Sequence, residues 1–479
     1  MKRLRRHLNP LLVATSCALV ASCGGSSRTN SLTLPTPVGG NPIGTWDWIS
    51  GANVVDASGS YGSLGVAAAS NTPGARTGSM GWTDASGNLW LFGGLGYDAE
   101  GNAGDLNDLW MFNPATGQWA WIYGAGTVNQ KGVYGTQGVA AAANVPGARE
   151  SGASWTDAAG NLWLFSGAGY DSAGTSAALN DVWEFSRTTG QWTWIGGAST
   201  VNAIGTYGTK GTAAAGNMPG AREVSASWVD ASGNLWVFGG LGLDSVGTSG
   251  DLNDLWEFNP SSGQWTWITG ASTVNASGVY GTKGAATAGS VPGARYAATS
   301  WIDSAGNLWL MGGSGYDSSG TNGSLNDLWE FTPSTGLWTW VSGASSANAL
   351  GVYGTEGTAA ATNGPGARQA PFAWTDAAGD VWLSGGIGYD GSGVNGYLND
   401  LWKFSPGTGQ WTWVNGAATA SAVGVYGTKG TAASANTPGA RFGARPWIDA
   451  AGSLWLFGGQ GVDSAGSVGE LNDLWKYAP

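Results

Sequence analysis

Six arginines and six aspartates recur at one fixed interval along this 479-residue chain. Each arginine ends a PGAR tetrapeptide and each aspartate ends an LND tripeptide, and both series repeat every 73 residues. The arginines are Arg76, Arg149, Arg222, Arg295, Arg368 and Arg441, and the aspartates are Asp108, Asp181, Asp254, Asp327, Asp400 and Asp473. This constant register predicts six structural ion pairs held by charge-assisted hydrogen bonds. The alternative is a set of arginines free to bind an anionic ligand.

The residue directly after each PGAR arginine varies, although the frame around it repeats. These residues are Thr77, Glu150, Glu223, Tyr296, Gln369 and Phe442. Arg445, in FGARPW, is also unmatched in the other copies. We expect these seven side chains to line one asymmetric ligand pocket. The alternative is that these positions tolerate many residue types and have varied without any role in binding.

Few residues of the chain are available for catalysis. His7 is the only histidine, and Cys17 and Cys23 are the only cysteines. Removal of an N-terminal leader would leave no histidine and would exclude a Ser-His-Asp triad, a Cys-His pair and histidine-bound copper or zinc. Glu150 and Glu223 remain weak candidates for a paired-carboxylate hydrolase, which needs carboxyls about 5–5.5 or 6.5–9.5 Å apart. We favour a protein without catalysis, cofactor or metal, and leave the enzyme open.

Other recurring polar and aromatic residues favour structural roles. The aspartates of GYD and its variants, such as Asp98, predict Asx-turns, because calcium would need six to eight oxygens. The tryptophans recur within strand-like segments, and this regular placement predicts that they are buried in the hydrophobic core. The tyrosines of VYGT and TYGT fall in predicted loops and are candidates for stacking on a ligand; they are Tyr134, Tyr207, Tyr280, Tyr353 and Tyr426.

The N-terminus has the pattern of a targeting segment. A basic stretch, MKRLRRHLNP, precedes the short apolar run LLVATSCALV, which ends in VASC. This pattern resembles the lipobox of bacterial lipoproteins. The resemblance implies that residues 1–22 are a signal peptide, that Cys23 is lipidated, and that the protein is anchored in the cell envelope, at the outer membrane. An ordinary secretory signal is the alternative.

Residues 23–42 are small, polar and proline-containing, and predict a flexible tether ahead of a folded body at 43–479. Removal of residues 1–22 takes away four basic residues and moves the formal charge from −12 to −16. Such an acidic chain repels nucleic acid, so we expect no nucleic-acid partner. The oligomeric state stays open.

Each 73-residue unit contains four strand-like segments. In the first unit these are TGSMGWTD, NLWLFGG, LWMFNP and QWAWI, with a loop of about a dozen residues, LGYDAEGNAGDL, between the second and third. Glycine-containing turns and large aromatics in short apolar runs are typical of a β-propeller. We therefore predict an all-β, six-bladed propeller of four-stranded antiparallel blades.

The motifs LFGG and LNDLWMF, followed after six residues by Trp119, resemble the kelch repeat of the galactose oxidase central domain. The resemblance covers residues 46–479. It implies a propeller and a binding or scaffold module for a glycan or a protein partner. A passive surface-coat protein and a histidine-free carbohydrate-active enzyme are alternatives. The copper chemistry of galactose oxidase is not implied, because no position matches its ligands. The units exceed the usual length of about 50 residues, and Ser166 replaces a motif glycine.

The last unit ends at Pro479, before its expected tryptophan pair. Six periods earlier, the missing positions fall on Trp46 and Trp48. We therefore expect residues 43–50 to supply the missing strand, to pair with DLWKYAP and to close the ring. The long segments fall on one face, and the six variable residues after PGAR would ring the channel mouth there. Long loops on a rigid scaffold commonly carry binding sites.

Overall fold

The computed structural model describes residues 44–376, 378–449 and 452–478. All the regular elements in these ranges are β-strands. Within them, a first unit of five strands forms one antiparallel sheet. Both β2 (Arg76–Thr77) and β3 (Met80–Thr83) pair with β4 (Leu89–Tyr97), β4 pairs with β5 (Ala103–Asn113), and β5 pairs with β6 (Gln118–Tyr123).

The next three units repeat this arrangement. The second contains β7 (Arg149–Glu150), β8 (Ala153–Thr156), β9 (Leu162–Tyr170), β10 (Ser176–Ser186) and β11 (Gln191–Gly196). The third contains β12 (Arg222–Glu223), β13 (Ala226–Val229), β14 (Leu235–Leu243), β15 (Ser249–Asn259) and β16 (Gln264–Thr269). The fourth contains β17 (Arg295–Tyr296), β18 (Thr299–Ile302), β19 (Leu308–Tyr316), β20 (Asn322–Thr332) and β21 (Leu337–Ser342). A bridge between Leu179 and Arg222 joins the second and third units into one ten-stranded sheet.

In the last two units the long strands are interrupted. The fifth contains β22 (Arg368–Gln369), β23 (Phe372–Thr375), β24 (Val381–Ser384), β25 (Ile387–Tyr389), β26 (Asn395–Tyr397), β27 (Leu401–Ser405) and β28 (Gln410–Asn415). The sixth contains β29 (Arg441–Phe442), β30 (Arg445–Ile448), β31 (Leu454–Phe457), β32 (Gln460–Val462), β33 (Val468–Glu470) and β34 (Leu474–Ala478). The separate strand β1 (Thr45–Ser50) pairs with β34, so that Trp46 lies opposite Tyr477 and Trp48 opposite Trp475.

The predicted twelve-residue loop at 95–106 is wrong in extent. Strand β4 continues to Tyr97 and β5 begins at Ala103, so most of this segment is a hairpin. The strands continue through a register shift between Phe92 and Gly94, where Gly94 adopts a φ of 103° that favours glycine. A bulge of this kind bends the strand pair without ending it.

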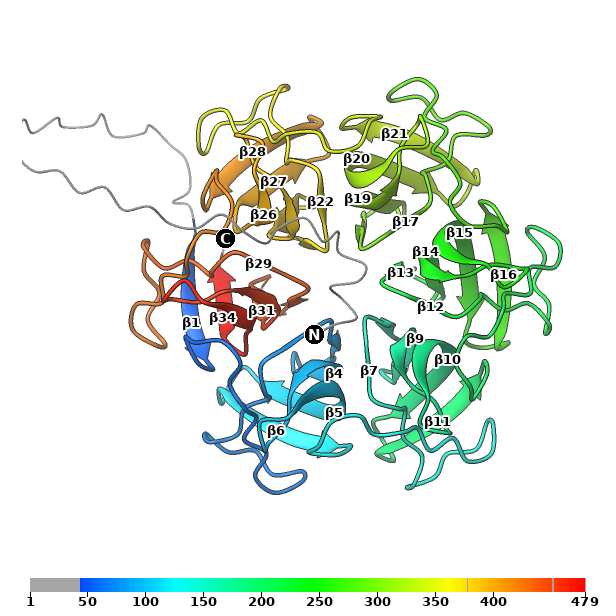
Figure 1. Cartoon of the computed structure of the whole chain (residues 1–479), viewed down its shortest axis with the longest axis vertical. Helices are drawn as coiled ribbons and strands as arrows, with labels where there is room; N and C mark the ends of the chain where they lie inside the picture. The colour runs from blue at the N-terminus through cyan, green and yellow to red at the C-terminus, as the bar shows by residue number, and fades with distance from the viewer. Residues whose placement is uncertain (1–43, 377, 450–451, 479) are drawn as a thin grey trace, which may run out of the picture. The chain divides into compact units, whose positions relative to one another are not determined.

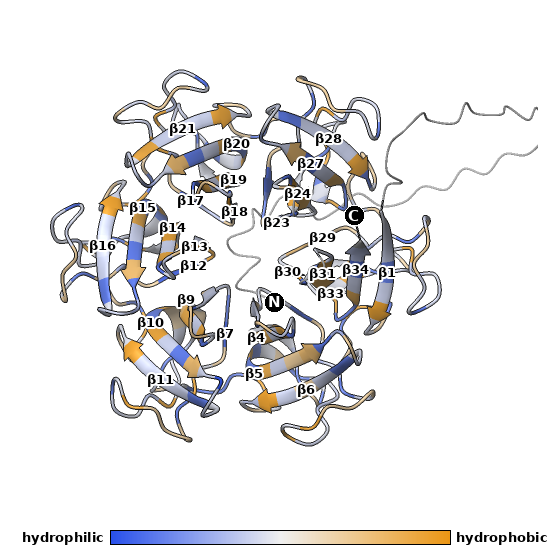
Figure 2. Cartoon of the chain, turned by 180° about the vertical axis from the view of Figure 1, so that it is seen from behind, coloured by the Kyte–Doolittle hydropathy of each residue, from blue (hydrophilic) through white to orange (hydrophobic). Residues whose placement is uncertain are grey.

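The sheets follow one another around a common centre (Figure 1). Strands β6, β11, β16 and β21 lie on the outside and β13 lies near the centre in both views, and Figure 2 also shows β18 near the centre (Figures 1 and 2). The short strands β3, β8, β13, β18, β23 and β30 each contact the next in that order, and β30 also contacts β3. The architecture is all-β, and its antiparallel sheets are compatible with a β-propeller.

The core lies between neighbouring units. One cluster joins Met80 and Trp82 of the first unit to Leu162, Leu164 and Trp183 of the second. Every described core cluster likewise draws its residues from two units. Large aromatic side chains suit this packing because each buries about 150–250 Å² between the sheets.

Candidate functional site

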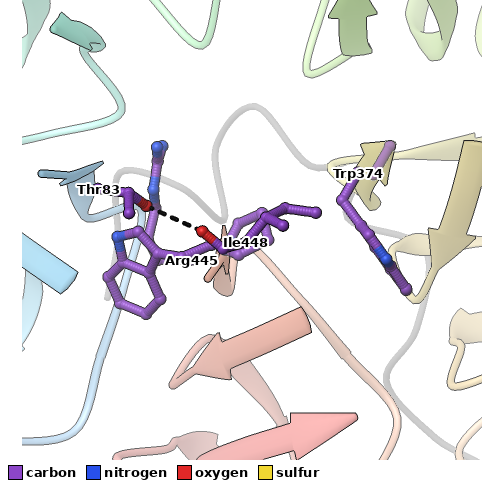
Figure 3. Close-up of a pocket in the computed structure, with 7 residues that line it drawn as sticks. Thr83, Trp374, Arg445 and Ile448 are labelled. Atoms are coloured by element: carbon purple, nitrogen blue, oxygen red, sulfur yellow. Dashed lines mark hydrogen bonds between the residues drawn. The ribbon is translucent and has the colours of Figure 1, made fainter. Parts of the chain in front are cut away.

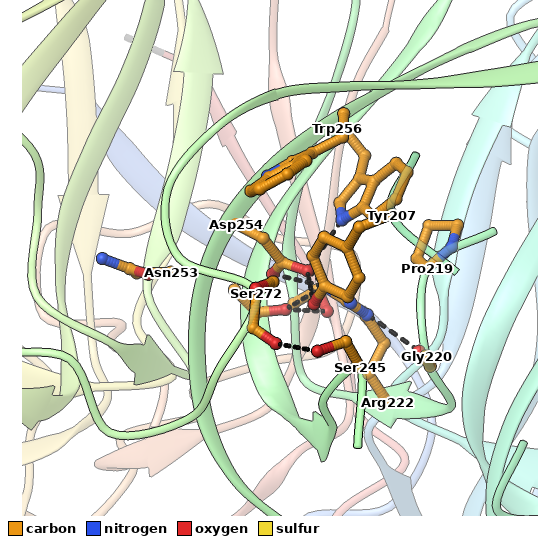
Figure 4. Close-up of polar contacts among 12 residues, drawn as sticks. Tyr207, Pro219, Gly220, Arg222, Ser245, Asn253, Asp254, Trp256 and Ser272 are labelled. Atoms are coloured by element: carbon orange, nitrogen blue, oxygen red, sulfur yellow. Dashed lines mark hydrogen bonds and ion pairs between the residues drawn. The ribbon is translucent and has the colours of Figure 1, made fainter. Parts of the chain in front are cut away.

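The repeated arginines and aspartates form buried ion pairs. In the third unit the Nη2 and Nη1 atoms of Arg222 both donate to the Asp254 carboxylate, each over 2.8 Å (Figure 4). The same carboxylate accepts from Tyr207 Oη at 2.6 Å and from Trp256 Nε1 at 2.7 Å. The other pairs are Arg76–Asp108, Arg149–Asp181, Arg295–Asp327, Arg368–Asp400 and Arg441–Asp473. None of these six arginines is left as a free anion site.

Electrostatics keep these pairs charged. Burial alone would lower the pKa of Arg222, but the charge and hydrogen bonds of Asp254 outweigh it and raise the pKa. Burial also raises the pKa of the Tyr207 hydroxyl, with the Asp254 charge adding to the effect. Because each carboxylate is fully satisfied, the cluster is a structural clamp between the start of one strand and the middle of another.

The tyrosines proposed as ligand platforms are buried instead. Tyr207 is 6% exposed, and its ring packs on Trp256 and Trp267 while its hydroxyl is held by Asp254. The corresponding residues Tyr61, Tyr134, Tyr280, Tyr353 and Tyr426 make the same bond to their own aspartates. That interpretation is therefore wrong: these rings belong to the clamps.

The GYD aspartates hold the tips of the hairpins. Asp98 Oδ1 accepts from the backbone N–H groups of Glu100 and Asn102, at 2.9 and 2.8 Å. Its Oδ2 accepts from the N–H of Val128 in the following connection, which ties the two segments together. This is the Asx-turn geometry that short polar side chains favour.

The variable residues after PGAR lie mostly out of solvent. Thr77, Glu150, Tyr296, Gln369 and Phe442 are buried, and Glu223 is partly buried. Two of them contact neighbouring residues: the Thr77 hydroxyl donates to Gly443 O, and Phe442 stacks on Tyr397 with centroids 5.9 Å apart. These six positions therefore present no open pocket, and their role in binding stays a prediction.

Glu150 is unusual among these residues. Its side chain is fully buried, and neither carboxylate oxygen has a hydrogen-bond partner among the described residues. Burial, followed by repulsion from Asp105 and Glu223, raises its pKa well above 4.5. Burial therefore favours the neutral form of Glu150 and closes it off from solvent, and in this conformation a substrate cannot reach it for hydrolysis by a carboxylate pair.

Arg445, the seventh predicted residue, lines a cavity of about 300 Å³ (Figure 3). The cavity is walled by residues of the short strands β3, β23 and β30, namely Thr83, Ala373, Trp374, Arg445, Pro446, Trp447 and Ile448. Most of this lining is apolar or aromatic. The long loops, where we predicted the site, do not contribute to it.

The Arg445 guanidinium lacks the clamp that the six repeated arginines have. Its Nη2 donates to Gly81 O at 2.6 Å, but its buried Nε has no hydrogen-bond partner, and it forms no ion pair within the described residues. Burial without a compensating carboxylate lowers its pKa to about 10. The group therefore still carries its charge at neutral pH, and that charge is partly desolvated and uncompensated.

Gly81 makes room for this arginine. A Cβ at Gly81 would lie 2.7 Å from the backbone oxygen of Trp90, 2.8 Å from Arg445 Nε and 2.8 Å from Trp447 Nε1. The equivalent positions in the other units hold Ser154, Ser227, Ser300, Ala373 and Pro446. Our sequence analysis missed Gly81, although its departure from the repeat was a usable signal.

Trp374 and its five equivalents adopt two arrangements. Trp82, Trp228 and Trp447 each donate from Nε1 to a backbone carbonyl of the next unit. Trp374 instead stacks on Trp382 of its own unit, with centroids 5.9 Å apart, and its buried Nε1 has no partner. Trp155 and Trp301 likewise stack on Trp163 and Trp309 and have buried Nε1 atoms without a partner, so the unpartnered indole is not particular to the cavity.

The remaining predicted residues lie elsewhere. Trp46 is buried against Trp475 and Tyr477, and Trp48 packs on Tyr426. Cys23, the signal peptide at 1–22 and the tether at 23–42 lie outside the described residues. In the ranges that are described, no group of three or more His, Cys, Asp or Glu is arranged to hold a metal ion. No helix in those same ranges has the length and hydropathy needed to cross a membrane.

No protein-family model matches the chain, and no curated protein matches it.

Proposed function

We propose that the chain is a six-bladed β-propeller of the kelch type, with residues 43–50 completing its last blade. Three observations support this proposal. Each 73-residue unit contributes antiparallel strands, β30 contacts β3 as well as β23, and β1 pairs with β34. The kelch assignment itself depends on the LFGG and LNDLW motifs of the sequence.

We also propose that the protein is a lipoprotein of the bacterial cell envelope, anchored at the outer membrane through Cys23, with residues 23–42 as its tether. The VASC motif and the preceding apolar run support this. Membrane fractionation after Cys23→Ser is the test. We expect the variant to be released or to keep its signal peptide. A processed variant that stays in the membrane would contradict lipidation.

We propose that the folded body is a binding module whose ligand enters the cavity beside Arg445. The observation that carries this proposal is an uncompensated, partly desolvated arginine beside aromatic walls. Structural arginines in this chain are paired with a carboxylate, as Arg222 is with Asp254. An arginine left unpaired at a cavity is suited to a polar group that arrives with the ligand. Aromatic walls favour a glycan over a protein segment as that ligand.

Glycan-array binding of the chain from residue 41 onward tests this function. We expect a subset of glycans to bind and the free sugar to compete. The apolar variant Arg445→Met, with an unchanged melting temperature, should lose that binding. An array on which nothing binds would contradict a glycan-binding module and favour a protein partner or a passive surface coat.

The enzyme alternative has a separate readout. A carbohydrate-active enzyme would consume a bound sugar, and Glu150→Gln or Glu223→Gln alone would abolish turnover. Because Glu150 is fully buried, we expect both variants to leave bound glycans unaltered and binding intact. Sugar turnover that either variant removes would reinstate the enzyme.

A further inference from the structure

The charge at Arg445 restricts the chemistry of the ligand. A guanidinium that has lost part of its hydration is stabilised by a hydrogen-bonded anion, and carboxylate and sulfate oxygens match its planar donors. Its Nε–H has no acceptor among the described residues, while Nη2 is anchored on Gly81 O. The side chain is therefore anchored on Gly81, and its charge has no counter-ion among the described residues.

The walls of the cavity restrict the rest of the ligand. Trp374, Pro446, Trp447 and Ile448 present mainly apolar surface. A bare inorganic anion would lose hydration there without gaining enough polar contacts. A sugar ring presents C–H faces to such walls, while a charged substituent on the ring can face the guanidinium of Arg445.

The size of the cavity sets a further limit. Ligand pockets commonly measure about 300–1,000 Å³, and this one, at about 300 Å³, is at the lower end. It has room for a single ring with its substituent. A terminal residue of a glycan fits this volume better than an internal stretch of polymer.

We propose that the cavity lined by Arg445, Trp374 and Trp447 binds one acidic sugar residue and that Arg445 pairs with its carboxylate or sulfate group. This inference rests on the proposed binding function and specifies its ligand. Uronates and sulfated sugars share the oxyanion chemistry, and the experiment below separates them.

Calorimetric titration of the full chain in detergent tests the inference. The probes are glucuronate, glucose 6-sulfate, glucose and inorganic sulfate. We expect one or both acidic sugars to bind about 10-fold or more tightly than glucose, the discrimination expected of a charged hydrogen-bonded pair. Glucuronate binding alone would assign a carboxylate, and glucose 6-sulfate binding alone would assign a sulfate. Inorganic sulfate should bind more weakly than either.

Two variants separate the site from general charge effects. Arg445→Met should weaken the acidic sugar about 10-fold or more while leaving glucose unchanged. Lys283→Met removes an exposed cation that donates to Gly343 O in the fourth unit, where no residue lines the cavity, and should change nothing. Melting curves verify that both variants fold. Gly81→Ser, which crowds the guanidinium without removing its charge, should also weaken binding.

Several outcomes would overturn the inference while leaving the binding function standing. These are equal affinity for glucose and glucuronate, full binding by folded Arg445→Met, and inorganic sulfate binding as tightly as the sugars. The inference also fails, and the binding function stands, if neither acidic sugar binds while other glycans bind on the array. If no probe binds and the array is also empty, both proposals fail together.

Discussion

Arg445 donates from Nη2 to the carbonyl oxygen of Gly81, 2.6 Å away, and the same oxygen accepts from the Ser154 hydroxyl at 3.1 Å. Both Arg445 and Gly81 depart from the residues that the other units carry at their positions. One departure accommodates the other, since a side chain at Gly81 would collide with the guanidinium. Two changes in different units that fit each other are better explained as one site than as independent drift.

The fit between these residues predicts a specific coupling. Gly81→Ser should destabilise the protein by about 1–3 kcal/mol, because it overpacks a filled space. In an Arg445→Ala background the same change should cost less, because the guanidinium is absent and only the contacts with Trp90 O and Trp447 remain. Ser154 occupies the equivalent position beside Trp82, whose indole bonds to a backbone carbonyl as Trp447 does. Serine is therefore compatible with the tryptophan.

A double-mutant cycle measured by denaturant unfolding checks this coupling. We expect an interaction free energy of about 0.5–3 kcal/mol between positions 81 and 445. Strictly additive costs would show that Gly81 has no particular relationship with Arg445.

The buried clamps predict a large difference between two kinds of ion pair. Arg222→Ala leaves the Asp254 carboxylate buried without its cation and should cost about 3–5 kcal/mol. The pair between Lys403 and Asp380 is partly exposed, so Lys403→Ala should cost at most about 1 kcal/mol. Urea unfolding of both variants gives the comparison. If the two variants lose similar amounts of unfolding free energy, the clamps do not stabilise the fold more than an exposed ion pair does.

The clamps also show where sequence reasoning succeeded and where it could not. The 73-residue register predicted strands, turns and the tryptophan core, because hydrophobic periodicity is local information. It could not predict that the Tyr207 side chain packs inward against Asp254, because a tyrosine in a predicted loop can be buried or exposed with the same local sequence. Nor could it distinguish Trp374 from Trp447: both have the same place in the repeat, yet one stacks and the other donates to its neighbour. The cavity depends on such side-chain directions.

Glu150 predicts a pH dependence of stability. Its folded pKa lies above the ordinary value of 4.5, so the unfolded chain releases this proton first as the pH rises. The contribution of the Glu150 proton to the free energy of unfolding is complete below pH 4.5 and is lost as the pH rises through the folded pKa. Glu150→Gln keeps the shape without the ionisable group, so its stability relative to the wild type should increase as the pH rises above 4.5.

Thermal melts across this range check the prediction, with Glu356→Gln as the control because Glu356 is exposed. We expect the control to follow the wild type at every pH. A constant difference between Glu150→Gln and the wild type would show that Glu150 is ionised in the folded protein.

The pairing of β1 with β34 predicts that residues 43–50 hold the two ends of the folded body together. Trp46 is 2% exposed and belongs to a cluster that contains Tyr477 and also Trp382 of the fifth unit. Trp46→Ala should therefore cost about 3–5 kcal/mol. Deleting residues 43–50 should lower the melting temperature further, because it also leaves the backbone groups of β34 as an unpaired edge.

A peptide of residues 43–50 added in trans distinguishes loss of this strand from a general folding defect. We expect it to restore much of the melting temperature of the deletion variant, because it can pair with β34 in the register that places residue 46 opposite Tyr477. A scrambled peptide of the same composition should have no effect, since its tryptophans would face the wrong side of the sheet. A deletion variant as stable as the wild type would show that β1 closes nothing.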